Sequence, residues 1–176
     1  MRTLHQLFLA ELHDLYDAEH RILDALDRMT EAVTDSELCQ AMTEHRKQTR
    51  THIDRLERVF KLLQVAPRRE MCEGIQGILT EGEELLEARA LLPEVRDAGI
   101  IAAAQKVEHY EIAGYGTACA FADIMGHEQA GTILHETLEE EKEADARLTA
   151  IAEGTVNASA LDADPEMSEE REPVRV

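Results

Sequence analysis

The segment IAAAQKVEHYEIAGYGTACAFADIM, residues 101–125, repeats small and apolar side chains at alternating steps of three and four. This spacing is the period of a helix that packs in a bundle. Two glutamates, Glu108 and Glu111, interrupt the apolar series in the middle of the segment. Pro93 suits the first turn of this helix, and Gly126 ends it. The segment therefore predicts a long packed helix whose buried face carries carboxylates.

Three other segments show the same helical period. They span residues 3–33, 36–64 and 128–153, and each lies next to another long helix in the sequence. The turn signals at 34–36 and at Gly126 leave very short connections. Short connections make neighbouring helices antiparallel, so the sequence predicts two helical hairpins.

The segment between the hairpins is long and contains a shorter predicted helix near residues 71–90, weakened by three glycines. Two antiparallel hairpins joined by one long crossover is the connectivity of ferritin-like bundles. We therefore predict an all-α, ferritin-like antiparallel four-helix bundle over residues 1–154, with a short extra helix in the crossover. From Thr155 onward the apolar period stops and prolines and acidic residues accumulate, which predicts an acidic, disordered tail at 155–176.

The composition excludes several classes of protein. There are 37 acidic and 18 basic residues, a formal net charge of -19. Nucleic-acid binding needs clustered cations, so we expect no nucleic-acid partner. No apolar run is long enough for a membrane span and no signal peptide is recognisable, so we expect no membrane association. The three cysteines, Cys39, Cys72 and Cys119, form no CxxC pair, which favours a reduced, cytoplasmic setting.

Polar residues interrupt the apolar face of every long helix near its middle. When each hairpin is folded about its turn, Glu19 lies opposite Gln48, Thr49 and His52, and Glu108 and Glu111 lie opposite the last helix. The interrupting residues therefore gather at one depth of the bundle. They are Glu19; His45, Thr49 and His52; Glu108 and Glu111; Glu141 and Asp145.

Several buried carboxylates at one depth would repel one another and lose their hydration, which costs several kcal/mol for each charge. A pair of metal ions removes this penalty. Oxygen-rich sites with one or two imidazoles suit iron or manganese better than zinc. The predicted cofactor is therefore two iron ions, with manganese as the alternative. The predicted metal ligands are Glu19, His45, Gln48, His52, Glu108, Glu111, Glu141 and Asp145.

Other polar residues have weaker signals. Tyr16, Thr49, His109 and Tyr115 could hydrogen-bond the ligands, although the two tyrosines also fit a pure packing role and His109 also fits a surface position. Any single interrupting residue could reflect a wrongly set helix register, whereas four helices interrupted at one depth are harder to explain that way. The other glutamates of the last helix predict a solvated acidic face, but Glu140 and Glu143 offer an alternative ligand pair if that helix is rotated. Histidines predicted at the surface are His5, His13, His20, His127 and His135.

With these residues the chain resembles the YciE/YciF family of ferritin-like proteins over about residues 4–153. The most specific segment is VRDAGIIAAAQKVEHYEIAGYGTACAFADIMG at 95–126, followed by ETLEEEKEAD at 136–145. DLYDAEHRILDAL at 14–26 and EHRKQTRTHIDRLERVF at 44–60 are also similar. The resemblance implies a homodimeric four-helix bundle with a dinuclear metal site, found in stress-associated bacterial proteins.

The chain departs from the family pattern in its second helix. Where many relatives carry a Glu at position 47 or 48, this sequence has Lys47 and Gln48. A neutral amide is a poorer ligand for a hard cation than a carboxylate, so we expect weaker binding at the metal position supplied by the first hairpin. We expect redox chemistry with dioxygen or peroxide in a stress response. A metal-sequestering protein and a non-catalytic stress protein with a structural polar core are the alternatives.

Overall fold

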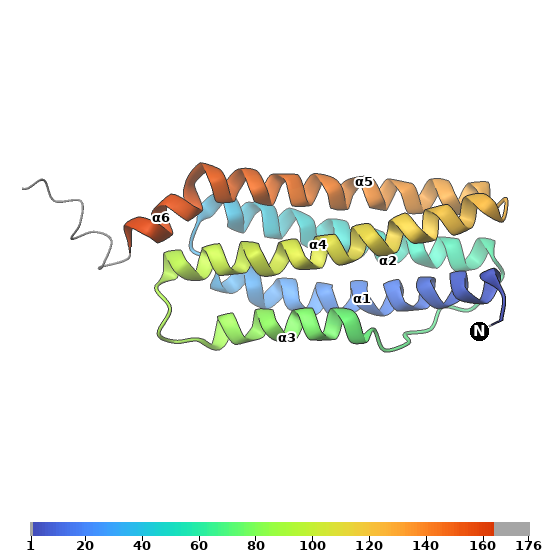
Figure 1. Ribbon diagram of the computed structural model, residues 1–176, viewed down its shortest axis with the longest axis horizontal. Helices are drawn as coiled ribbons and strands as arrows, with labels where there is room; N and C mark the ends of the chain where they lie inside the picture. Colours follow the sequence, from blue (N-terminus) through green and yellow to red (C-terminus); the bar gives the residue numbers. More distant parts are fainter. Residues whose placement is uncertain (1, 164–176) are drawn as a thin grey trace, which may run out of the picture.

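Four long helices form one bundle in the computed structural model, which describes residues 2–163 (Figure 1). Helix α1 packs against both α2 and α4, and α5 packs against the same two helices, so every neighbour in the ring is antiparallel. This all-α, ferritin-like architecture confirms the predicted fold. The long helices are α1 (Leu4–Ala32), α2 (Ser36–Leu62), α4 (Pro93–Ile124) and α5 (Glu128–Ile151).

The helix ends follow local capping chemistry. Thr3 caps α1 by accepting a hydrogen bond from the backbone N–H of Gln6 at 3.1 Å. Asp35 caps α2 by accepting from two backbone N–H groups at 2.9 Å. Pro93 occupies the first turn of α4, and Gly126 has a φ of 74°, the left-handed conformation that glycine adopts without strain. These signals explain why the predicted boundaries lie within two residues of the observed ones.

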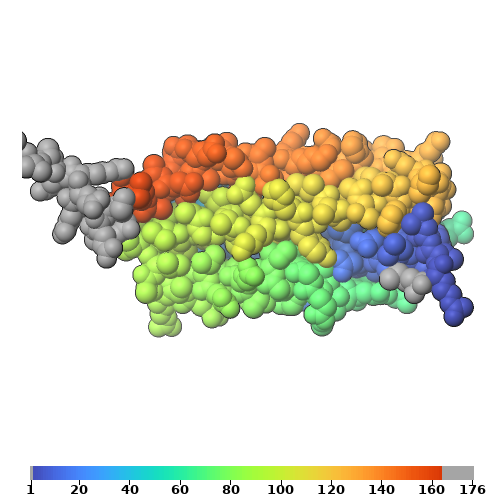
Figure 2. All heavy atoms as spheres, viewed as in Figure 1, coloured from blue at the N-terminus to red at the C-terminus, as the bar shows by residue number. Residues whose placement is uncertain are grey.

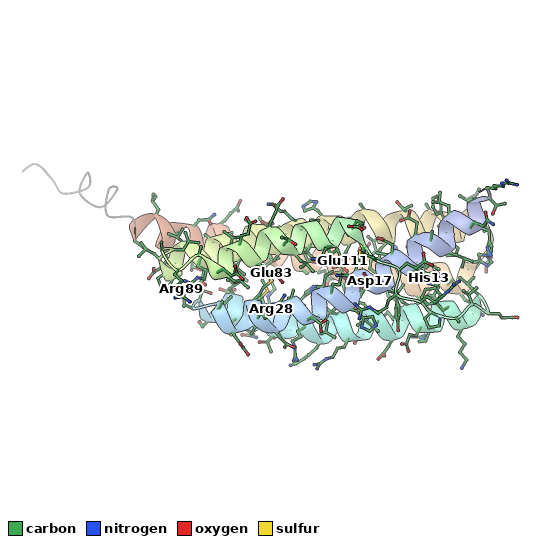
Figure 3. The ribbon with its side chains drawn as sticks, turned by 90° about the horizontal axis from the view of Figure 1, so that it is seen from below. His13, Asp17, Arg28, Glu83, Arg89 and Glu111 are labelled. Carbon is green, nitrogen blue, oxygen red and sulfur yellow. The ribbon has the colours of Figure 1, made fainter. Side chains whose placement is uncertain are left out.

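The crossover between the hairpins carries α3 (Glu73–Glu87), which packs against α1 and α4. In the space-filling view α3 covers much of α1 on this side of the molecule (Figure 2). Arg28 and Glu83 form an ion pair that joins α1 to α3 (Figure 3). The bundle thus has a fifth helix on one face only.

The crossover is tied to α1 by two buried polar side chains, Asp17, which the sequence did not single out, and His13, which it placed at the surface. Asp17 is buried and accepts hydrogen bonds from the backbone N–H of Cys72 at 3.0 Å and from Arg69 at 2.9 Å. His13 contacts the backbone of Arg68 at 3.1 Å and stacks on Phe60. The prediction that His13 lies at the surface is therefore wrong, because the crossover covers this part of α1.

The helical path continues beyond the predicted end of the bundle. A π-helical turn at Ala152–Val156 leads into α6 (Asn157–Asp162). Val156 is only 2% exposed and belongs to the apolar core, so its burial holds this segment against α4. The prediction of disorder from residue 155 is thus wrong for residues 155–162, and residues 164–176 of that predicted tail lie outside the described part of the chain.

Within the described residues, no helix is both long and apolar enough to cross a membrane. The three cysteines are free thiols. A cytoplasmic location stays a prediction.

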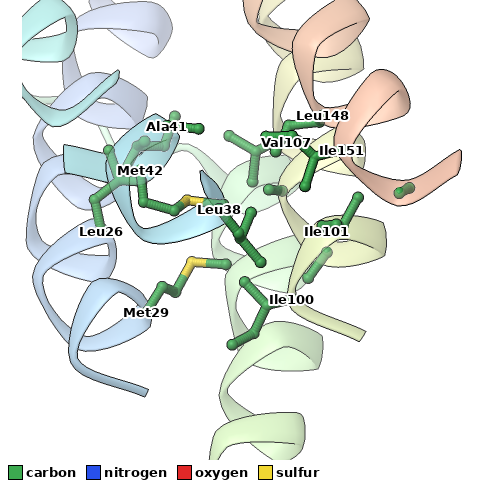
Figure 4. Packing of buried hydrophobic residues seen from close by; sticks show 14 of the residues in the cluster. Leu26, Met29, Leu38, Ala41, Met42, Ile100, Ile101, Val107, Leu148 and Ile151 are labelled. Atoms are coloured by element: carbon green, nitrogen blue, oxygen red, sulfur yellow. The ribbon is translucent and has the colours of Figure 1, made fainter. Parts of the chain in front are cut away.

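The apolar core is divided into two clusters along the bundle. One cluster includes Ile22, Leu26, Met42, Ile101 and Leu148, and most of its members are drawn in Figure 4. The other is made by side chains nearer the opposite end, among them Phe8, Leu12, Leu56, Phe60, Tyr115 and Leu134. In each long helix the predicted ligands fall between members of the two clusters. The middle of the bundle is therefore a polar layer between two apolar ones.

Candidate metal centre

The polar layer gathers carboxylates and imidazoles from all four long helices. The four glutamates and two histidines of this group are between 0% and 7% exposed, so they are shielded from bulk water. Glu111, for example, points into the middle of the bundle (Figure 3). We call this group the buried cluster. Its members are Glu19, His45, His52, Glu108, Glu111 and Glu141.

The buried cluster divides into two sets of ligand atoms. One set comes from His45, Glu108, Glu111 and Glu141, and the other from Glu19, His52 and Glu141. Within each set, one ligand atom from each residue lies within 4.8 Å of the others. Glu141 belongs to both sets, so its carboxylate can connect two adjacent metal positions.

Individual distances place Glu141 between the two histidines. Its Oε1 lies 2.9 Å from Nδ1 of His52, and its Oε2 lies 3.9 Å from Nε2 of His45. His45 Nε2 also lies 3.4 Å from Glu108 Oε1, and His52 Nδ1 lies 3.4 Å from Glu19 Oε1. Each imidazole thus faces two carboxylates through one ring nitrogen.

The electrostatics of this cluster are unfavourable without a cation. Burial and the neighbouring carboxylates raise the pKa of Glu108 and of Glu111 well above the usual range, which favours their protonated forms. Burial also acts against the charged imidazolium of His52, but Glu19 and Glu141 outweigh it and raise its pKa to about 11. Burial lowers the pKa of His45, which favours the neutral ring. Without metal ions, bound protons therefore neutralise part of the negative charge of the buried cluster.

The hydrogen bonding of the cluster is incomplete. Buried polar atoms in proteins are nearly all hydrogen-bonded, and each exception requires an explanation. Eleven buried side-chain atoms make no hydrogen bond within the described structure. Two belong to Arg46 and Arg96, and the nine others are carboxylate oxygens or ring nitrogens of the buried cluster. Such atoms are the donor groups of iron and manganese sites, so the residues present fit a pair of these ions. The atoms belong to Glu19, His45, His52, Glu108, Glu111 and Glu141.

Two residues outside the predicted ligand set orient His52. Its Nε2 contacts Oε2 of Glu140 at 2.8 Å, and Arg55 donates to both oxygens of Glu140 at 2.7 Å. This contact occupies Nε2 and leaves Nδ1 facing the cluster. Glu140 was predicted on a solvated face or as an alternative ligand, and Arg55 was not singled out. An Arg one turn after a buried His is the sequence signal that could have suggested the pairing.

Two of the side chains predicted to assist the ligands contact the cluster. Tyr115 is buried and its hydroxyl donates to Oε1 of Glu19. Thr49 is also buried, and its hydroxyl donates to the backbone carbonyl of His45 at 3.1 Å. Tyr115 therefore acts on a ligand side chain, whereas Thr49 contacts only the backbone of one.

Comparison with known proteins identifies the family to which the chain belongs. The family model of DUF892, a domain of unknown function, matches residues 3–161. The chain belongs to the DUF892 family. It is 40% identical to Protein YciF of Escherichia coli K12 over 161 residues, which cover 91% of this chain and 96% of that protein. The resemblance to YciE/YciF proteins is thereby confirmed.

Two solved structures with 40% sequence identity share the architecture. The crystal structure of the Escherichia coli stress protein YciF matches with a TM-score of 0.85 and 40% identity, covering 89% of this chain and 99% of that one. YcfI of Rhodopseudomonas palustris matches with a TM-score of 0.83 and 40% identity, covering 86% and 96%. A protein of Xanthomonas campestris matches with a TM-score of 0.72 at 20% identity, covering 89% and 95%, which shows the fold alone.

Three side chains that were predicted to bind the metal or to hydrogen-bond its ligands lie away from the cluster. Asp145 is half-buried, accepts from Gln105 at 3.1 Å and lies 3.5 Å from the exposed His109. The hydroxyl of Tyr16 donates to Glu57 at 2.8 Å. The structure brings none of these three into either set of ligand atoms, and their predicted roles gain no support from it.

Gln48 lies on a different side of the cluster from the one expected. The sequence placed it beside Glu19 and His52, whereas the side chain is half-buried and lines a small pocket with His45 and Glu108. One turn of α2 separates Gln48 from His52, so both side chains turn towards the interior but lie beside different sets of ligand atoms. Any weakening caused by the amide therefore concerns the His45 position.

Proposed function

We propose that this homologue of YciF binds two iron or manganese ions in the buried cluster. The observation that carries the proposal is the set of nine buried oxygen and nitrogen atoms without hydrogen bonds, arranged in two groups that share Glu141. His52 Nδ1 and Glu141 Oε1 form an ion pair at 2.9 Å, but a protein core that lacked cations would leave the other atoms unsatisfied at a cost of about 1–3 kcal/mol each. The carboxylate-rich donor set favours iron or manganese over zinc.

In this proposal some residues would bind the metal ions and others would hold those ligands in place. Glu141 would contribute to both positions. His45, Glu108 and Glu111 would complete one position, and Glu19 and His52 would complete the other. Glu140 holds His52 so that Nδ1 is presented, and Tyr115 holds Glu19. Iron or manganese bound there would exchange electrons with dioxygen or peroxide in a stress response.

The test of binding is elemental analysis by mass spectrometry after expression in medium supplemented with iron and manganese. We expect about two first-row ions per chain. A Glu111→Gln/Glu141→Gln double variant is the control, because it keeps the shape of the cluster and removes two charges. Less than a few tenths of an ion per chain in the wild type would contradict the proposal.

The redox role is tested separately. Metal-loaded protein should consume hydrogen peroxide faster than the metal-free protein and the double variant. Binding without consumption would favour metal sequestration. An absence of metal would favour a non-catalytic stress protein, for which the ion pair between His52 and Glu141 would serve as a structural polar core.

We also propose a homodimer, as in the family that the sequence resembles. Large apolar side chains exposed at one end of the bundle support an interface, and they include Leu4, Leu62 and Ile124. Light scattering at several protein concentrations tests it, and a monomer mass at all of them would contradict it.

A further inference from the structure

The buried cluster is not sealed equally on all sides. Glu19, His52, Glu111 and Glu141 are 0% exposed, whereas His45 is 7% and Glu108 is 2% exposed. His45 and Glu108 are also the two cluster members that line a small pocket between α2 and α5. The other residues that line it are Ala41, Met42, Gln48, Ala144, Arg147 and Leu148.

The size of this pocket limits what can occupy it. Its volume is about 30 Å³, which has room for one or two molecules of the size of water. The α5 side of its wall is made by Ala144 and Leu148, and Met42 faces them from α2. The small side chain of Ala144 is what leaves this space open.

The mouth of the pocket carries balanced charge. Arg147 of α5 forms an ion pair with Glu44 of α2, and both side chains are partly exposed. Because the two charges compensate each other, the mouth attracts neither cations nor anions strongly. An apolar wall behind such a mouth favours a small neutral molecule.

On the opposite side of the cluster, other side chains cover the ligands. Arg55 and Glu140 cover His52, and Tyr115 covers Glu19. A molecule arriving from solvent would therefore meet His45 and Glu108 first.

We propose that this pocket is the entrance through which neutral molecules of the size of water, dioxygen or hydrogen peroxide reach the His45 side of the cluster. The side chain of Ala144 sets the width of the entrance, and the side chain of Arg147 partly closes its mouth. The entrance serves the redox role proposed above and rests on it for its biological purpose, but its existence can be measured without metal.

The measurement is deuterium exchange at the C2 carbon of the His45 ring in the metal-free protein, with the exposed His109 as internal reference. Ala144→Leu should slow exchange at His45 about tenfold by excluding water, while His109 is unchanged. Ala146→Leu is the matched control, since it makes the same change on the exposed face of the same helix. Arg147→Ala should act in the opposite direction and speed exchange at His45.

The outcomes separate the two proposals. Equal exchange at His45 in wild type, Ala144→Leu and Arg147→Ala would overturn the entrance, even if the protein binds two metal ions. The expected exchange pattern, together with elemental analysis that finds no metal uptake by the supplemented wild type, would support the entrance and contradict the proposed function. If Ala144→Leu does not fold by circular dichroism, Arg147→Ala decides alone. In metal-loaded protein, Ala144→Leu should keep the manganese content and slow oxidation by peroxide.

Discussion

His52 and Glu141 meet in the middle of the bundle, with Nδ1 of the imidazole 2.9 Å from Oε1 of the carboxylate. They come from α2 and α5, the two helices that contribute every residue lining the pocket except Glu108. Because the second oxygen of Glu141 faces His45, this carboxylate links the two halves of the cluster. The predictions below follow from that central position.

Glu141 and Glu108 should differ in how many ions they control. We expect Glu141→Gln to weaken both binding steps, since its carboxylate belongs to both sets of ligand atoms. Glu108→Gln should weaken one step, because Glu108 belongs to one set only. Titration with Mn(II) followed by calorimetry checks this. Equal losses in the two variants would contradict a connecting role for Glu141.

Glu140 should affect metal affinity without being a ligand. Removing the partner that orients a metal-binding histidine typically costs 10–100-fold in affinity, so we expect about that loss in Glu140→Gln. Glu139→Gln is the control, since Glu139 is exposed and pairs with Lys142 on the same helix. The same titration measures both variants. Unchanged affinity in Glu140→Gln would show that His52 needs no such support.

The metal-free protein should lose stability as pH rises from 5 to 8. The pKa of Glu108 and of Glu111 is raised in the folded state, so their contribution is fully present below the ordinary value of 4.5 and is lost as pH rises through the raised values. Each ionising glutamate can cost up to about 1.4 kcal/mol per pH unit. His52 acts in the same direction, because its pKa is raised from 6.5 to about 11, so its contribution is fully present below pH 6.5 and decreases as pH rises above that value.

Urea unfolding of chelator-treated protein checks this pH dependence. Glu111→Gln should flatten it, because the amide does not ionise. Metal-loaded protein should show the opposite slope, since ions compete with protons for the same atoms. A metal-free wild type that gains stability between pH 5 and 8 would contradict the prediction.

Asp17 should anchor the crossover to α1. Burial acts to raise its pKa, but hydrogen bonds from Arg21, Cys72 and Arg69 outweigh it and hold the pKa below its ordinary value. The stability that Asp17 contributes is therefore present above its unfolded pKa and is lost as pH falls through the lowered folded value. We expect Asp17→Asn to lower the free energy of unfolding by about 1–3 kcal/mol at pH 7.

The control for this change is Asp24→Asn, which removes an exposed carboxylate from the same helix. Chemical denaturation at pH 7 measures both. If both variants lose the same stability, the anchoring role assigned to Asp17 is wrong.

Gln48→Glu tests the departure from the family pattern. Gln48 lines the pocket beside His45 and Glu108, so a carboxylate there should tighten the binding step of the His45 position and leave the other step nearly unchanged. Titration with Fe(II) or Mn(II) resolves the two steps. The opposite outcome is that the only tightened step is the one that Glu19→Gln abolishes. Gln48 would then lie beside Glu19, as the sequence predicts.

The sequence by itself determined the bundle and the depth of its polar layer. Apolar period, capping residues and short turns are local properties, and they specified the four long helices to within two residues. Folding each hairpin about its turn then aligned Glu19 with His52, and Glu111 with Glu141, because antiparallel helices of equal rise keep their register along the axis.

Only the tertiary structure decided which neighbours on a helix face the interior. Adjacent residues such as Glu140 and Glu141 point about 100° apart, so a small rotation of α5 exchanges a ligand for a residue that supports one. That rotation is fixed by the packing of α5 against α2 and α4, to which apolar side chains from distant segments contribute. The same reason explains His13, which reads as a surface residue on α1 until the crossover packs over it. Long-range packing has no signature in a local pattern.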